Sequence, residues 1–174
     1  MNNLIRNTIA IDANVFVHMF MHMIDPDNNP YEHIRALLYR LRKAKFGILL
    51  DESRMIAREY RKHVFPCFLK TDDDDTKRLL RYWFRQENQK IVPINLNDNL
   101  MRAIKSIVGP SKGADRFYVY VALKEGRILV TNDRRDIWSN RDRLLKIKTR
   151  PRLPKGADIL NSKRAHYKLT RDKL

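Results

Sequence analysis

The sequence has little cysteine and no long apolar run, and each scarcity excludes a class of protein. Cys67 is the only cysteine among 174 residues, which excludes a disulfide framework and a cysteine-rich zinc site. No stretch approaches the roughly 18 apolar residues of a transmembrane helix. The N-terminal residues also lack the apolar core and cleavage site of a signal peptide. We therefore expect a cytoplasmic protein that does not enter a membrane.

Acidic residues are in the minority as well. The chain carries 20 Asp and Glu against 36 Lys and Arg, for a formal net charge of +16. Such an excess does not select a fold, but it favours a polyanionic partner, with nucleic acid ahead of a membrane surface. The hydrophobic content of 43% is enough for a sizeable core within one domain.

Short apolar runs alternate with segments of helical periodicity along the chain. Because strands that alternate with helices form parallel sheets, we expect an α/β three-layer sandwich with a central, mostly parallel five-stranded sheet. Pro93 places its strand at an edge of that sheet. The helix that follows residue 51 is expected to end at residues 64–66. The strands are predicted at residues 8–11, 46–50, 91–94, 128–130 and 145–149.

The chain is expected to leave the sheet after residue 149. Residues 148–174 contain nine Lys and Arg against two Asp, with two prolines early in the segment. We therefore divide the chain into a domain at residues 1–149 and a basic C-terminal extension at residues 150–174.

Three aspartates fall where a parallel sheet brings its strand ends together. Asp12 follows the first strand, Asp115 begins a helix, and Asp133 follows the strand at residues 128–130. Ligands bind in the crevice outside the carboxyl ends of such strands. A fourth carboxylate is expected from the helix after the second strand, where Glu59 is one candidate. Glu52 and Asp51 are its alternatives.

A cluster of carboxylates needs something that neutralises it. Two of them about 4 Å apart repel by roughly 4 kcal/mol at an effective dielectric constant near 20. Their pKa values rise, or a divalent cation lies among them. Oxygen ligands without His or Cys favour Mg²⁺ or Mn²⁺ over zinc. Water bound to such an ion is a ready nucleophile for phosphodiester hydrolysis. A basic chain around an acidic metal pocket is typical of a nuclease.

Three motifs together resemble the PIN domain family: IAIDANVF, the S-x5-E spacing of SRMIARE, and ADRFYVYVALKEGRILVTND. The resemblance spans most of residues 8–149. It implies a metal-dependent endoribonuclease, a hydrolase that leaves a 5′-phosphate and a 3′-hydroxyl. By the same resemblance the catalytic and metal-binding residues are Asp12, Glu59, Asp115 and Asp133.

Further residues are assigned around these four. By the same resemblance Asn14 and Thr131 match positions that support the metal ligands, and Asp136 is expected to assist or replace Asp133. Since basic residues begin directly after Asp133, we expect them to contact the nucleic acid, which we expect to be RNA rather than DNA. They are Arg134, Arg135, Arg141, Arg143, Lys146, Lys148, Arg150 and Arg152.

One alternative explains the charge equally well. It is a non-catalytic, RNA-binding PIN-domain subunit of an RNA-processing or ribonucleoprotein assembly. A protein inhibitor or antitoxin and a homodimer remain open as partners.

Overall fold

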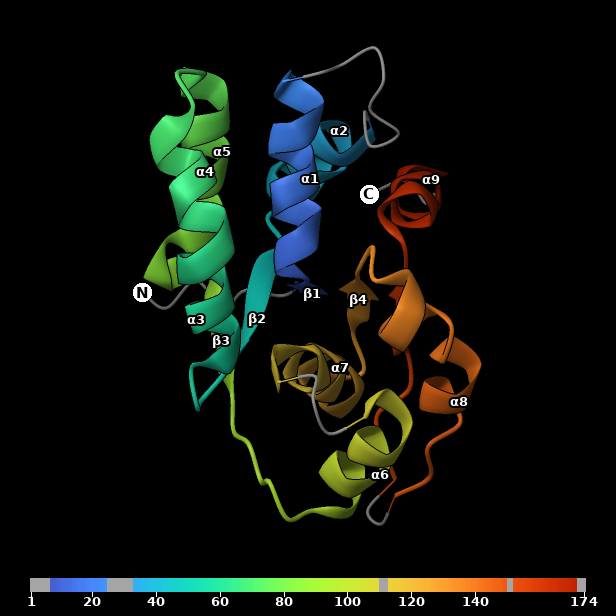
Figure 1. The fold of residues 1–174 in the computed structure, drawn as a ribbon. Coiled ribbons are helices and arrows are strands. Elements are labelled where there is room, and N and C mark those ends of the chain that lie inside the picture. The colour runs from blue at the N-terminus through green and yellow to red at the C-terminus, as the bar shows by residue number, and fades with distance from the viewer. Residues whose placement is uncertain (1–6, 25–32, 110–112, 150–151, 172–174) are drawn as a thin grey trace.

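The computed structural model describes residues 7–24, 33–109, 113–149 and 152–171, and it confirms the α/β class (Figure 1). Its centre is a five-stranded sheet in the order β3-β2-β1-β4-β5, and every neighbouring pair is parallel. β3 is an edge strand, as Pro93 predicts. The strands are β1 (Thr8–Ile11), β2 (Gly47–Asp51), β3 (Gln89–Val92), β4 (Ile128–Val130) and β5 (Asp158–Leu160).

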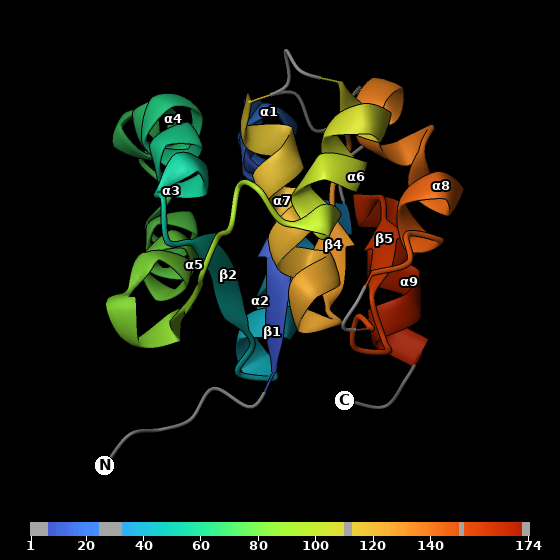
Figure 2. The same ribbon diagram turned by 90° about the horizontal axis from the view of Figure 1, so that it is seen from below.

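Helices cover both faces of this sheet. In Figures 1 and 2, α1 and α2 lie on one face and α7 lies on the other, with α6 packed against α7. The helices are α1 (Ala13–Ile24), α2 (His33–Lys43), α3 (Met55–Glu59), α4 (Phe65–Lys70), α5 (Asp74–Phe84), α6 (Asn99–Val108), α7 (Gly113–Glu125), α8 (Arg141–Leu145) and α9 (Ser162–Arg171). Shorter elements are the π-helical turns η1 (Tyr60–Val64) and η3 (Arg134–Trp138) and the 3₁₀ turn η2 (Gln86–Asn88). None of the helices in the described ranges is long and apolar enough to span a membrane.

The strand order reverses between β1 and β4. Ile11 of β1 lies opposite Val130 of β4, and the backbone N–H of Asp12 donates to the carbonyl of Val130 at 2.9 Å. The chain leaves β1 for the α1 face and reaches β4 from α7 on the opposite face. The carboxyl ends of these two strands therefore lie at the switch point of the sheet, the position at which α/β sheets bind ligands, and we call this position the β1–β4 crevice.

The last strand is not where the sequence pattern predicts it. Residues 145–149 form the end of α8 and an irregular segment, and β5 is Asp158–Leu160, paired with β4. In the predicted segment, apolar residues alternate with Lys146 and Lys148, both of which are exposed. Ile159 and Leu160 are only 1% and 5% exposed. A strand covered by helices needs apolar side chains on both faces, and the segment at Asp158–Leu160 supplies them.

The C-terminal segment is therefore not an extension that leaves the sheet. It adds β5 to the sheet, and α9 then packs against α2. Gly126 explains how the intervening loop closes: with a φ of 60°, a Cβ there would lie 2.7 Å from the carbonyl oxygen of Lys155. Only glycine permits this approach.

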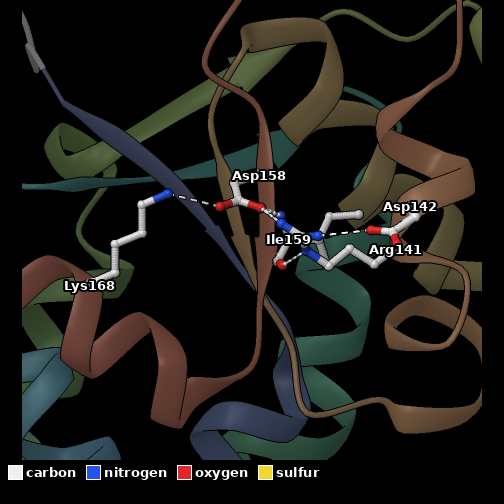
Figure 3. Close-up of polar contacts among 5 residues, drawn as sticks. All are labelled: Arg141, Asp142, Asp158, Ile159 and Lys168. Carbon is white, nitrogen blue, oxygen red and sulfur yellow. Dashed lines mark hydrogen bonds and ion pairs between the residues drawn. The ribbon is translucent and has the colours of Figure 1, made fainter.

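Ion pairs join β5 to both flanking helices. Asp158 accepts from Arg141 of α8 at 2.6 Å and from Lys168 of α9 at 2.9 Å (Figure 3). Burial opposes ionisation, but the hydrogen bonds from Lys168 and Arg141 outweigh it and lower the pKa of Asp158. Arg141 also donates to the carbonyl of Ile159 at 2.8 Å. Lys168, which belongs to the predicted basic extension, therefore contributes to the fold through Asp158.

One predicted helix end is also wrong. The helix after β2 was expected to end at Val64–Phe65–Pro66, but it continues through η1 and α4 to Lys70. Pro66 lies in the first turn of α4, where the π-helical turn η1 passes into the α-helix.

Candidate metal centre

Three carboxylates meet at the crevice between β1 and β4. One carboxylate oxygen from each of Asp115, Asp133 and Asp136 lies within 4.8 Å of the other two. Asp115 is in the first turn of α7, Asp133 follows β4, and Asp136 is in η3. All three are partly buried. The structure therefore brings together two of the aspartates assigned as ligands and the one expected to assist them.

The turn after β4 determines where two of these carboxylates lie. Asp133 begins η3, and its Oδ1 accepts from the backbone N–H groups of Arg135 and Asp136, both at 2.9 Å. The N–H of Asp133 donates to Thr131 Oγ1 at 3.0 Å. Because both bonds to the Asp133 carboxylate use Oδ1, they leave Oδ2 as its candidate metal ligand. The same turn places Asp136 beside it.

Asp12 lies at the end of β1 and is almost completely buried, with 5% of its surface exposed. Its Oδ2 accepts from Thr131 Oγ1 at 2.7 Å and from Asn14 Nδ2 at 2.8 Å. Its Oδ1 accepts from the N–H of Asn14 at 3.2 Å. The residues expected to support the metal ligands, Asn14 and Thr131, thus both bind Asp12.

Burial raises the pKa of Asp12 to about 7, because desolvation of the charged carboxylate outweighs its hydrogen bonds. The negative charges of Asp115 and Asp133 raise it further. Asp12 therefore shares an electrostatic site with these two aspartates, although it does not belong to the group of three whose oxygens are within 4.8 Å. A cation at the group would favour the ionised form of all four carboxyls.

Glu59 is not brought into this group of three. Its carboxylate lies 3.2 Å from Nε2 of His63, one turn along the helix. The charge of Glu59 nevertheless contributes to the raised pKa of Tyr118, after burial and other neighbours. Tyr118 accepts from the N–H of Ala13 at 3.2 Å, at the start of α1.

Its two alternatives do not join the group either. Asp51 is buried and accepts from the N–H groups of Met55 and Ile56 at 2.9 and 2.7 Å, so it caps α3. Glu52 is exposed on the same turn.

The basic residues expected to contact nucleic acid differ in their exposure and in the partners of their side chains. Arg134 and Arg135 are exposed directly beside Asp133, where a polyanion approaching the aspartates would meet them. Arg141 was expected to contact nucleic acid, but its guanidinium is occupied by Asp158, the Ile159 carbonyl and Asp142 (Figure 3). Arg143 is exposed and donates to Asn140 at 3.0 Å. Lys146, Lys148 and Arg152 are exposed, and Arg150 lies outside the described residues.

Sequence reasoning did not identify Asn132 or the buried tyrosines Tyr60 and Tyr118 as parts of this site. The hydroxyl of Tyr60 donates to the carbonyl of Ile11, directly before Asp12. Two tyrosines in apolar segments look like ordinary core residues, and only their hydroxyl partners reveal that they fix the start of α1. Asn132 had a usable signal, because it lies between Thr131 and Asp133.

The donor set fits a hard divalent cation. It consists of carboxylate oxygens without His or Cys, which is the ligand chemistry of Mg²⁺ or Mn²⁺. Comparisons with family models, curated proteins and solved structures find no match to this chain.

Proposed function

We propose that this protein is an endoribonuclease that hydrolyses RNA phosphodiester bonds with bound Mg²⁺ or Mn²⁺. The observation that supports the proposal is the convergence of Asp115, Asp133 and Asp136 within 4.8 Å at the β1–β4 crevice, near the buried Asp12. Unneutralised carboxylates at such distances repel one another, and a divalent cation removes that cost. The resemblance to PIN domains points to the same position in the fold.

Each aspartate has a distinct role in this proposal. Asp115, Asp133 and Asp136 hold the cation, and Asp12 supplies negative charge near them. Thr131 and Asn14 bind the Asp12 carboxylate and fix its orientation. In this proposal Asp136 assists Asp133 as a ligand, and Glu59 is not a ligand. When bound, the cation supplies an activated water and neutralises charge on the scissile phosphate.

The substrate is recognised mainly by its charge. The protein carries a net charge of +16, and Arg134 and Arg135 are exposed beside Asp133. Arginine binds phosphate oxygens through a planar fork of donors, so these two residues would hold the RNA backbone next to the cation. The proposal therefore assigns backbone binding to η3.

The test is an RNA cleavage assay on total cellular RNA with mapped fragment ends. Wild type, Asp115→Asn and Asp75→Asn are compared in Mn²⁺ and in EDTA. Asp75 is an exposed aspartate of α5, so Asp75→Asn controls for the loss of one negative charge. Wild type and Asp75→Asn should cleave in Mn²⁺ and leave 5′-phosphates. EDTA should abolish cleavage, and Asp115→Asn should lose at least a hundredfold.

Equal cleavage by Asp115→Asn would contradict the proposal, because the activity would then come from elsewhere or from a contaminant. Absence of cleavage with tight RNA binding by all three proteins would instead identify a non-catalytic RNA-binding subunit.

A further inference from the structure

We propose that Asn132 is a positioning residue which, held by Ser162 of α9, orients Asp12 through Asn14. The inference rests on the proposed function only in treating the aspartates at the crevice as a metal centre. It assigns to the C-terminal helix a role in metal affinity, although Ser162 is 30 residues from Asn132 in the sequence.

The side chain of Asn132 is fixed on two sides. Its Oδ1 accepts from Ser162 Oγ at 2.9 Å and from the N–H of Ser162 at 3.1 Å. Its Nδ2 lies 3.1 Å from Nδ1 of His18 on α1. Ser162 is only 1% exposed, so its two bonds to Asn132 are shielded from water. Hydrogen bonds of this kind determine both the rotamer and the amide orientation of Asn132.

The backbone of Asn132 transmits this position to Asp12. The N–H of Asn132 donates to Asn14 Oδ1 at 3.1 Å. Because an N–H requires an acceptor, the amide oxygen of Asn14 must face Asn132, and its NH₂ group faces the carboxylate. That NH₂ group donates to Asp12 Oδ2 at 2.8 Å. The order of bonds is thus Ser162, Asn132, Asn14 and Asp12.

Ser162 also ties this series of bonds to the helix layer. Its hydroxyl oxygen lies 2.8 Å from Nε2 of His33 on α2, against which α9 packs. Ser162 begins α9 one residue after the end of β5. The C-terminal segment therefore reaches the metal centre through a defined polar contact as well as through the sheet.

The experiment measures the Mn²⁺ dissociation constant by electron paramagnetic resonance for wild type, Asn132→Ala, Ser162→Ala and the double variant. Ser106→Ala, which removes an exposed hydroxyl on α6, is the control. Asp12 is not itself a proposed ligand, but Asn132 directly precedes the proposed ligand Asp133, and residues that orient metal ligands typically change metal affinity by about 10- to 100-fold when replaced. We expect Asn132→Ala and Ser162→Ala to weaken Mn²⁺ binding at least about 10-fold. Ser106→Ala should leave it unchanged.

The double variant separates positioning from a general loss of stability. If Ser162 acts through Asn132, the double variant should bind Mn²⁺ no more than about twofold more weakly than Asn132→Ala, since coupled residues are not additive. The inference would be overturned if the two single substitutions weakened Mn²⁺ binding by factors that multiply in the double variant. It would also be overturned if the variants melted at lower temperatures with unchanged Mn²⁺ dissociation constants. If Asn132→Ala does not fold, Ser162→Ala still tests the inference. An unchanged Mn²⁺ dissociation constant for Ser162→Ala would then be enough to overturn it.

The two proposals fail differently. Equal, tight Mn²⁺ binding by wild type and every variant refutes the positioning role and leaves the metal centre standing. A wild-type protein that binds no Mn²⁺ refutes the metal centre, and the positioning role falls with it.

Discussion

The hydroxyl of Thr131, at the end of β4, donates to the carboxylate of Asp12, at the end of β1, at 2.7 Å. This bond joins the two strands at which the sheet order reverses. It also satisfies a buried carboxyl whose pKa is raised to about 7 by desolvation. The bond thus connects the fold to the electrostatics of the candidate site.

The raised pKa of Asp12 predicts how stability depends on pH in the absence of metal. Between about pH 4 and pH 7 the folded protein keeps a proton on Asp12 that the unfolded chain has lost. The free energy of unfolding therefore falls as pH rises through this window, by an amount of order 4 kcal/mol, and then levels off. Urea unfolding in EDTA at pH 5 and pH 8 measures the part of this fall that lies above pH 5, about 3 kcal/mol.

Asp12→Asn is the control for this prediction, because it removes the titrating group and should remove the fall. His18 and His166 have pKa values lowered by burial, so their contributions to stability rise with pH and oppose that of Asp12. The informative quantity is therefore the difference between wild type and Asp12→Asn. Identical pH dependence in the two proteins would show that Asp12 titrates normally.

The geometry predicts opposite outcomes for Asp136 and Glu59. Asp136→Asn removes a carboxylate that lies within 4.8 Å of two others, so Mn²⁺ affinity should fall at least tenfold. Glu59 lies beside His63 and outside that group, so Glu59→Gln should change the affinity less than threefold. Isothermal titration with Mn²⁺ distinguishes them. The reverse order would restore Glu59 as the fourth ligand.

Arg134 and Arg135 should contribute to RNA affinity in a manner that depends on salt. Each contact with a single-strand phosphate adds about 0.7 to the slope of log K against log salt concentration. Replacing both arginines with glutamine should lower that slope by about 1.4. The matched control replaces Arg78 and Arg81 of α5, and its slope should stay closer to that of wild type. Binding is measured in EDTA by fluorescence anisotropy, so that cleavage does not interfere.

Arg141 should behave as a structural residue instead. Arg141→Gln breaks its ion pair with Asp158, whose side chain is 15% exposed, and should lower the free energy of unfolding by about 1–3 kcal/mol. RNA affinity at 25 °C should change less than twofold. Chemical denaturation and anisotropy on the same preparation test both statements. Unchanged stability with weakened RNA binding would return Arg141 to the RNA-binding surface.

Much of the fold could be predicted because its signals are local. The runs that form β1 and β4 are apolar and short, and both are followed by aspartate-containing turns. The alternation of such strands with helices leads to a parallel sheet. β5 could not be predicted, because it offers only the apolar pair Ile159 and Leu160 after Asp158, whereas β4 is an uninterrupted apolar run. Its place depends on pairing with β4 and on the contacts of Asp158 with two helices.

The residues of the candidate site also divide into those with a local sequence signal and those without one. Asp12, Asp115 and Asp133 follow from strand ends and a helix start, which the sequence marks. The directions of the Asp136 and Glu59 carboxylates depend on helix phase. For Asp136 the π-helical turn η3 sets that phase, and no local sequence pattern predicts this turn. The bonds of Asn132 to Ser162 are contacts between segments that are distant in sequence.

The most direct test of the metal centre is a crystal of the wild-type protein soaked in Mn²⁺, with anomalous diffraction recorded near the manganese edge. An anomalous peak at about 2.0–2.2 Å from carboxylate oxygens of Asp115, Asp133 and Asp136 is the predicted result. A well-ordered site with these three carboxylates and no anomalous density, or with a peak elsewhere on the surface, would contradict it.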